Sequence, residues 1–251
     1  MLGPKRTVFP CLAFSCLCAC TVLEDRDSCP CTLSLVSASD VGRAHVMLDA
    51  RNGFLWEESV EDVDESRFQV PRDMVRCCVV RGAEPGPEGS WMIPEGDDCP
   101  EYYMHRSLID ARCDFVTDTL EFHKRFCVMD ISFSGREMEP SLRLEVRSST
   151  AGYDRYGDSA EGVFRHSPSR TARGAYRLRL PRQLSSDLEL KAAFPSGDSA
   201  VYPLGVYLQG LGYDWDAEDL EDVQIQIDSR NSTVKIITSC WKKSLTFDLR
   251  I

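Results

Sequence analysis

The sequence is short of positive charge and of long apolar runs. Its 251 residues include 29 Lys and Arg against 40 Asp and Glu, which gives a net charge of −11. Because nucleic acid and anionic membrane surfaces bind clustered positive charge, this balance argues against both as electrostatic partners. Beyond the N-terminal segment, the longest uncharged run (199–213) is interrupted by Pro203 and three glycines, so no segment is predicted to cross a membrane as a helix.

Histidine is also scarce, which limits the catalytic chemistry that the sequence can support. Gly157-Asp158-Ser159 is similar to the nucleophile motif of one lipase and esterase family, whose base stands in an Asp-x-x-His motif. None of the four histidines has Asp three residues earlier, and a serine without a positioned base is a weak nucleophile. We therefore interpret Gly-Asp-Ser as a turn and predict no catalytic residue and no enzymatic activity. A His–carboxylate–Ser cluster in the fold would reopen the hydrolase interpretation.

Metal-site motifs are equally lacking. There is no His-Glu-x-x-His, and Cys29-Pro30-Cys31 has one residue between its cysteines where zinc sites usually have two. The segment 214–218 resembles the start of a calcium loop. However, Asp219 stands where that loop requires glycine, and Ile225 stands where it requires glutamate. We predict no metal and no cofactor.

The N-terminal segment is typical of an export signal. Two basic residues precede an uncharged apolar stretch (7–19), which suits a secretory signal peptide but is too short for a transmembrane helix. It ends in Leu17-Cys18-Ala19-Cys20, which resembles a bacterial lipobox, and we predict lipidation of Cys20. Several acyl chains make a lasting anchor because each buried methylene contributes about 0.8 kcal/mol. The alternatives are lipidation at Cys16 and ordinary cleavage that leaves Cys20 unmodified.

Eight cysteines remain after removal of the signal and Cys20. In an exported protein they permit disulfides, and we expect between zero and two. Cys77 and Cys78 are neighbours on one predicted strand, so they point to opposite faces and are not expected to pair with each other. Cys127 stands between apolar residues and is interpreted as a small buried hydrophobe. The eight are Cys29, Cys31, Cys77, Cys78, Cys99, Cys113, Cys127 and Cys240.

Strand patterns dominate the mature chain. In 142–147, apolar and charged residues alternate strictly, which places one face in a core and the other in water. Many short strands separated by turn signals predict an all-β fold built from β-sandwiches. The predicted strands are 32–36, 44–48, 67–70, 75–80, 141–147, 176–180, 187–194, 223–228, 233–238 and 244–249.

Helical signals are few, and one composition shift suggests a division into domains. A short helix is predicted over 204–212 and a turn over 217–221. The Gly- and Pro-rich segment 81–100 predicts a long loop, and the segment 120–126 is predicted to open a long strand. The predicted units are a signal peptide (1–19), a lipidated tether (20–28), an N-terminal β-sandwich (29–116) and a C-terminal β-sandwich (117–251).

Four separated motifs resemble those of a known family. The mature start joins Cys20 to an acidic segment and Cys-Pro-Cys, and 122–128 matches a strand that opens the family's second domain. Leu180-Pro181-Arg182-Gln183 is the third motif, and 202–223 is the fourth and most specific, with Val206 in place of a common glutamate. Together they resemble the FimB-like, Mfa-type fimbrial anchor subunits of Bacteroidales. The family-motif residues are His123, Lys124, Phe126, Pro203, Leu204, Gly205, Tyr207, Gly212, Tyr213, Asp214, Trp215, Leu220 and Asp222.

The resemblance implies two tandem transthyretin-like sandwiches, tethered by lipid to the outer membrane and exposed at the surface, that hold the base of a fimbrium. It implies a fimbrial shaft subunit as partner, joined by β-strand complementation. In such systems an arginine- or lysine-specific protease removes a subunit's first strand. Arg43 and Arg51 are the candidate protease sites, and cleavage at either would sever this protein from its lipid. We therefore predict that 32–36 stays in place and that the protein is an anchor; a tip or shaft role is the alternative.

A surface glycan-binding lipoprotein is a second alternative, because it would share the lipobox and the sandwiches. A glycan platform needs two or three exposed, coplanar aromatic rings on one face. Tyr213 and Trp215 are interpreted instead as amphipathic rings that pack beneath a loop.

Overall fold

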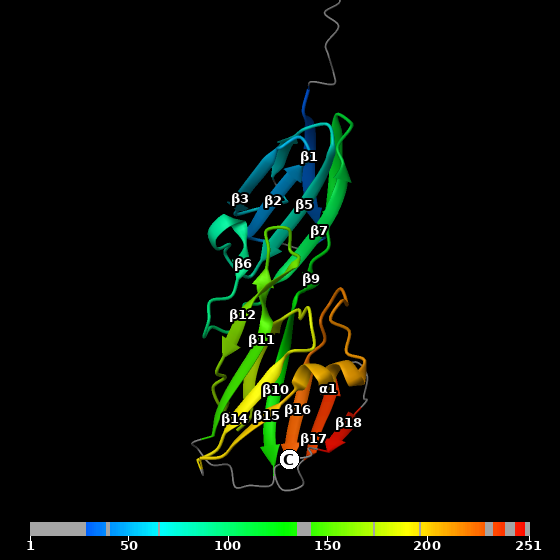
Figure 1. Ribbon diagram of the computed structural model, residues 1–251. Helices are drawn as coiled ribbons and strands as arrows, with labels where there is room; N and C mark the ends of the chain where they lie inside the picture. Colours follow the sequence, from blue (N-terminus) through cyan, green and yellow to red (C-terminus); the bar gives the residue numbers. More distant parts are fainter. Residues whose placement is uncertain are drawn as a thin grey trace, which may run out of the picture.

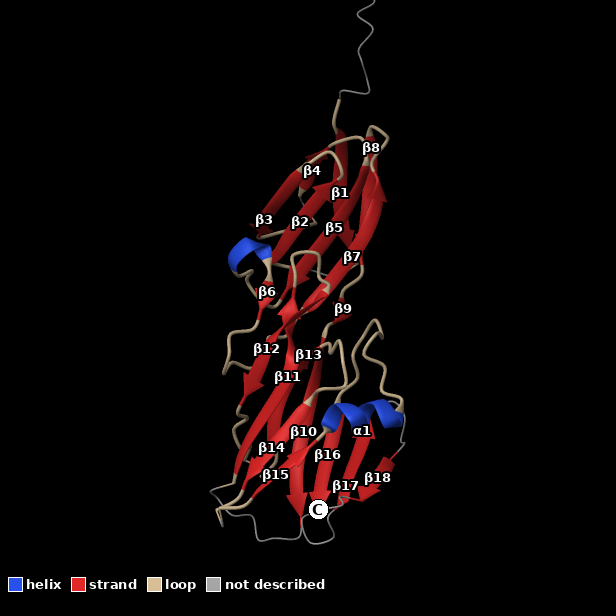
Figure 2. Cartoon of the chain, in the orientation of Figure 1, coloured by secondary structure: helices blue, strands red, loops and turns tan. Residues whose placement is uncertain are grey.

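The computed structural model describes residues 29–38, 41–64, 66–134, 142–172, 174–195, 197–228, 233–238 and 244–248. The predicted signal peptide and tether, with Cys20, lie outside the described residues, as do Ser141 and Leu249 at the ends of two predicted strands. Strands make up nearly all of the regular structure (Figure 2). They are β1 (Cys31–Ser37), β2 (Ala44–Ala50), β3 (Leu55–Val60), β4 (Arg67–Val70), β5 (Met74–Arg81), β6 (Trp91–Met92), β7 (Tyr103–Asp110), β8 (Phe115–Leu120), β9 (His123–Lys124), β10 (Phe126–Ser134), β11 (Arg143–Tyr153), β12 (Ser159–His166), β13 (Tyr176–Pro181), β14 (Glu189–Ala193), β15 (Ser199–Tyr202), β16 (Val223–Asp228), β17 (Thr233–Thr238) and β18 (Ser244–Asp248). The helical elements are η2 (Pro87–Gly89) and α1 (Leu204–Leu211).

The strands form two β-sandwiches that lie end to end in an elongated molecule (Figure 1). In the first, a three-stranded sheet of order β4-β1-β8 faces a sheet of order β3-β2-β5-β7-β9. In the second, the sheet β13-β10-β16-β17-β18 faces the sheet β12-β11-β14-β15. The prediction of an all-β fold with two sandwiches is confirmed.

Alternation along the strands explains how each sheet covers a core. In β16, Val223, Ile225 and Ile227 are buried while the glutamines between them are exposed. The central strand β5 is apolar on both faces, and its adjacent cysteines divide between two cores: Cys77 packs in that of the first sandwich and Cys78 in the other. Burial raises the pKa of Cys78 to about 12. The expected opposite orientation of these thiols is confirmed.

The second core extends across the junction between the sandwiches. Met47, Val80 and Met104 belong to strands of the first sandwich, yet they pack in the same apolar cluster as residues of β10 and β11. β6 lies between β5 and β7 in the sequence, yet it pairs with β11 of the second sandwich, with Met92 opposite Gly152. A Cβ at Gly152 would stand 2.2 Å from the Trp91 carbonyl oxygen, so this approach requires glycine. The long loop predicted over 81–100 therefore contributes a strand to the second sandwich.

The predicted division after residue 116 needs correction. It falls inside β8, which pairs with β1 from Phe115 to Leu120 and belongs to the first sandwich. The segment 120–126 is also not the start of one long strand. Leu120 ends β8, β9 pairs with β7, and β10 begins only at Phe126. The local sequence pattern could not separate these short strands, because each of the three belongs to a different sheet.

Candidate functional site

β1 occupies the middle of the three-stranded sheet of the first sandwich. It pairs antiparallel with β4 and parallel with β8, so it has a backbone partner on each side. Cys31, Leu33 and Leu35 have no exposed surface and fill the core, whereas Val36 is 38% exposed. The predicted first strand is confirmed with one additional residue at each end. In this structure β1 closes the groove between β4 and β8.

The beginning of β1 is fastened by contacts from both of its neighbours. The Arg72 Nε donates to the Cys29 carbonyl at 2.9 Å, and the Arg72 guanidinium also pairs with Asp114. The Thr32 N–H donates to the Asp114 carbonyl at 3.0 Å, and the Gln69 amide donates to the Thr32 hydroxyl at 3.1 Å. The segment next to the predicted tether is thus held by backbone and side-chain bonds.

Both candidate protease sites are exposed. Arg43 lies between β1 and β2, where its guanidinium pairs with Glu61 at 3.6 Å and Glu84 at 3.3 Å. Its side chain is 56% exposed. Arg51 lies in the turn between β2 and β3 and is also exposed. Cleavage at Arg43 would separate β1 from the rest of the chain, and cleavage at Arg51 would separate β1 and β2.

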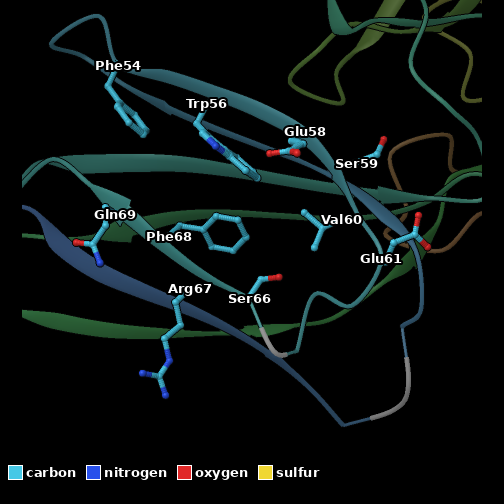
Figure 3. A pocket seen from close by; sticks show the side chains of 10 residues that line it. All are labelled: Phe54, Trp56, Glu58, Ser59, Val60, Glu61, Ser66, Arg67, Phe68 and Gln69. Atoms are coloured by element: carbon cyan, nitrogen blue, oxygen red, sulfur yellow. The ribbon is translucent and has the colours of Figure 1, made fainter.

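A groove of about 560 Å³ lies between the edges of the two sheets of the first sandwich (Figure 3). Its walls are β3 and β4, each the last strand on one side of its sheet in the described part of the chain. The rings of Trp56 and Phe68 meet there edge to face, with centroids 4.7 Å apart. Glu58, Glu61 and Arg67 stand around these rings (Figure 3). The sequence motifs did not indicate this groove, because it depends on which strands become sheet edges.

The fold brings two of the family motifs, 122–128 and 202–223, together at the end of the second sandwich that faces the first. The Lys124 ammonium pairs with Asp222 and donates to the Leu220 carbonyl at 3.2 Å. The Asp219 carboxylate accepts the Lys124 backbone N–H at 2.6 Å and lies 3.3 Å from His123 Nδ1. The Lys124 ammonium lies 5.0 Å from the centre of the Phe126 ring. These residues fasten the segment after α1 to the start of β10.

The α1 motif is also explained by close packing. The predicted helix is confirmed as α1, which follows Pro203 and ends at Gly212, whose φ of 74° favours glycine. Leu204 is buried, and Tyr207 packs against the core from a half-buried position. A Cβ at Gly205 would stand 2.4 Å from the Ser186 carbonyl oxygen. The helix thus approaches the segment before β14 more closely than a larger residue would allow.

The aromatic residues after α1 are packed and do not form a flat platform. The Tyr213 hydroxyl donates to the Glu221 carbonyl at 2.7 Å, and Tyr213 and Trp215 are both half-buried. Their rings meet at 62° with centroids 4.6 Å apart. Asp214 accepts the Asp216 N–H at 2.8 Å and shapes the loop. Beneath them, Cys127 has no exposed surface, and burial raises the pKa of its thiol to about 12.

One His–carboxylate–Ser cluster occurs in the first sandwich. His105 Nε2 lies 3.0 Å from Asp118 Oδ2, and the Ser107 hydroxyl donates to the same oxygen at 2.5 Å. The Glu121 N–H donates to His105 Nδ1 at 3.0 Å, which assigns the imidazole proton to Nε2. Neither ring nitrogen is left to take a proton from Ser107, so the cluster lacks the arrangement of a serine hydrolase. It links β7 to β8, which belong to different sheets.

Asp118 is the electrostatic centre of that cluster. Burial opposes its ionisation, but the hydrogen bonds from His105 and Ser107 outweigh burial, and the pKa of Asp118 is lowered. The Gly157-Asp158-Ser159 segment lies elsewhere, in a turn where Gly157 has a φ of 75° and Asp158 pairs with Arg106 at 2.6 Å. This position agrees with the interpretation of Gly-Asp-Ser as a turn.

Neither a metal site nor a membrane-spanning helix is found in the described part of the chain. No group of three His, Cys, Asp or Glu side chains there could hold a metal ion. Across the same residues, no helix has the length and apolar character needed to span a membrane. Cys20, the predicted lipidation site, lies outside those residues.

Comparison with known proteins finds similarity in structure alone. No protein-family model matches the sequence, and no curated protein matches it. The fold is similar to the fimbrial anchor protein Mfa2 from Porphyromonas gingivalis, with a TM-score of 0.60 and 12% identity over 85% of this chain and 98% of that chain. A candidate adhesin from Bacteroides thetaiotaomicron matches with a TM-score of 0.59 and 14% identity, over 86% of this chain and 98% of that chain. Candidate polysaccharide-binding proteins from the same organism match with a TM-score of 0.61 and 9% identity, over 88% of this chain and 98% of that chain.

These matches define the class of fold. The chain is an all-β protein of two tandem sandwiches, and nearly the whole length of the Mfa2 chain is matched. The expected likeness to Mfa-type fimbrial proteins is thus confirmed in the fold. At 14% identity or less, function must be argued from this protein's own residues.

Proposed function

We propose that this protein is a structural subunit of a cell-surface fimbrium, and that it forms the lipid-anchored base. The arrangement of β1 carries the proposal. β1 is paired on both sides, and its buried face completes the core of the first sandwich. A subunit that keeps its first strand has no vacant groove between β4 and β8, so it ends a strand-exchange series instead of continuing it.

The proposed attachment to the outer membrane is lipid on Cys20. The lipobox Leu17–Cys20 supports it, and only ten residues separate Cys20 from Cys31 at the start of β1. Fully extended, that tether spans roughly 35 Å, so the first sandwich would stand near the membrane surface. A Cys20→Ala variant should leave the membrane fraction, whereas retention of the variant there would contradict lipid anchoring.

The proposed partner is a fimbrial shaft subunit that binds by β-strand addition. Strands β3, β4, β8, β9, β12, β13, β15 and β18 each end a sheet in the described part of the chain. An extended segment of the shaft subunit could pair with one of these edges through backbone hydrogen bonds. Membrane fimbriae purified with and without this protein test the role: loss of attachment, or longer shed filaments, is the expected result. Unchanged, membrane-bound fimbriae would contradict it.

The anchor and shaft roles differ in the N-terminus of the mature protein. Mass spectrometry of the purified protein should find Cys20 and β1 on one continuous chain. A new N-terminus at Ala44 or Asn52, with the segment that carries Cys20 and β1 lost from the protein, would show cleavage after Arg43 or Arg51 and would reassign the protein to the shaft or tip. Arg43→Gln and Arg51→Gln variants are the matched controls, because they remove these cleavage sites while leaving β1 unchanged.

Glycan binding is the second candidate function, and the likeness to candidate polysaccharide-binding proteins favours it. The rings of Tyr213 and Trp215 meet at 62°, and those of Trp56 and Phe68 meet at 64°. Neither pair offers the flat surface on which a sugar ring stacks. Affinity electrophoresis in gels that contain surface polysaccharides separates the two functions: unchanged mobility is expected for an anchor, and retardation would favour glycan binding.

A further inference from the structure

The pairing of β1 with β8 brings two cysteines from distant parts of the sequence to one corner. In the parallel register, Thr32 lies opposite Phe115, and the Thr32 N–H donates to the Asp114 carbonyl at 3.0 Å. The residue before Thr32 is Cys31, and the residue before Asp114 is Cys113. The ion pair between Arg72 and Asp114 closes the same corner.

The strand pairing places the two thiols near each other. The pKa of the Cys31 thiol is raised, first by burial and next by its interaction with the Cys113 side chain. Both cysteines are free thiols in this structure. Cys31 has no exposed surface, while Cys113 is exposed and its thiol lies 3.2 Å from the Phe115 carbonyl. One partner is therefore accessible to a reagent from solvent, and the other is held against it.

We propose that Cys31 and Cys113 form a disulfide that fastens β1 to the segment between β7 and β8. The oxidant is a protein or small-molecule disulfide that acts by thiol–disulfide exchange. The Cys113 thiolate attacks it to give a mixed disulfide and release one thiol. The Cys31 sulfur then attacks Cys113, forms the S–S bond and expels the second thiol. The two cysteines lose two protons and two electrons, and the oxidant is reduced to two thiols.

Cys29 is the competing partner, and its geometry is less suitable. It is exposed, and its carbonyl is held by Arg72 at 2.9 Å. Cys31 instead belongs to β1, where the register with β4 and β8 fixes its position next to Cys113. The bond therefore involves the second cysteine of Cys-Pro-Cys.

What the disulfide does for attachment rests on the proposed anchor function. That function also implies export to a compartment where disulfides can form. Cleavage after Arg43 would break the chain between β1 and β2. With Cys31 joined to Cys113, however, the segment that carries β1 and Cys20 would remain covalently attached to the sandwich. The disulfide would thus preserve membrane attachment even after the exposed site is cut.

Peptide mapping of the full-length exported protein tests the bond. Free thiols are alkylated without reduction, and tryptic peptide 27–43 is expected to be linked to peptide 113–124. Fragmentation should assign the link to Cys31, and Cys29→Ser should retain it while Cys31→Ser abolishes it. Quantitative alkylation of both Cys31 and Cys113 in the wild type, or a link through Cys29, would overturn the proposal. The wild-type map needs no variant to fold.

A protease assay tests the consequence on the same protein. An arginine-specific protease that cuts after Arg43 should leave one band on a non-reducing gel, and reduction should release the N-terminal fragment. Release without reduction would overturn this consequence. The two proposals can fail separately: a mapped disulfide with normally attached fimbriae in the deletion strain rejects only the anchor role. Free thiols on a chain that begins at Cys20 reject only the disulfide.

Discussion

Lys124 and Asp222 are 98 residues apart in the sequence and form an ion pair at the end of the second sandwich that faces the first. The same Asp222 carboxylate accepts the Val128 N–H at 2.9 Å. The Asp222 side chain thus holds Lys124, just before β10, and Val128, within β10, against the segment that leads into β16. This contact gives a structural reason for the joint presence of the motifs 122–128 and 202–223.

Replacement of Asp222 with Ala should therefore destabilise the second sandwich. The variant leaves the Val128 N–H and the Lys124 ammonium without their acceptor, and hydrogen bonds that involve charged groups contribute about 1.5–3 kcal/mol. Because Asp222 is half-exposed, we expect a loss of about 1–2 kcal/mol in chemical denaturation. Glu218→Ala, an exposed change in the same segment, should alter stability by less than about 0.5 kcal/mol. Equal effects of the two variants would contradict this role for Asp222.

Leu33 is the residue with which to test the packing of β1. It has no exposed surface and lies in the core of the first sandwich. Leu33→Ala should cost about 2–4 kcal/mol, because it removes buried methyl groups and leaves a cavity. Val36→Ala, on the same strand but 38% exposed, is the control and should cost much less. Thermal unfolding of the two variants measures the difference, and a tolerated Leu33→Ala would show that β1 adds little to the fold.

Asp118 should make the stability of the first sandwich depend on acid pH. Its pKa is lowered in the folded protein because hydrogen bonds from His105 and Ser107 outweigh burial. A depressed folded pKa contributes stability above the unfolded value of about 3.9, and that contribution is lost as pH falls below it. The difference in unfolding free energy between wild type and Asp118→Asn should thus be larger at pH 7 than at pH 3.

The control for this measurement is Glu189→Gln, on the exposed face of β14. Its difference from wild type should change little over the same pH range. If the Asp118→Asn difference stays constant between pH 7 and pH 3, the ionised carboxylate does not stabilise the cluster.

Gly205 provides a test of the close packing of α1. A Cβ there would stand 2.4 Å from the Ser186 carbonyl oxygen and 2.5 Å from its carbon, both of which are backbone atoms. Gly205→Ala should force the helix away and cost about 1–3 kcal/mol, despite the higher helix propensity of alanine. Val206→Ala, at a 52% exposed position of the same helix, should be nearly neutral. A stabilised Gly205→Ala would mean that the helix can shift without loss of packing.

Three of the predicted strands have side chains that alternate clearly. β4, β16 and β17 have the predicted bounds, because one face of each meets a core and the other meets solvent. β3 was missed since its residues are mostly half-buried at a sheet edge, without a clear period of two. β6 has only two residues, and its existence depends on pairing with β11 rather than on local pattern.

The candidate site could be predicted only in part, for a similar reason. The motif residues Lys124 and Asp222 were recognised, but their contact depends on the parallel pairing of β10 with β16. The proximity of Cys31 and Cys113 depends likewise on the parallel pairing of β1 with β8. Parallel neighbours are distant in sequence, and local patterns carry no information about which strands will meet.

The pairing of β6 with β11 of the second sandwich has a mechanical consequence. A pull along the molecule's long axis cannot separate the two sandwiches by stretching a linker alone. The hydrogen bonds between β6 and β11, and the apolar cluster shared by Met47, Val80 and Met104, must yield as well. Tension is therefore divided between the covalent chain and a packed interface, so the two halves resist extension as one stiff body.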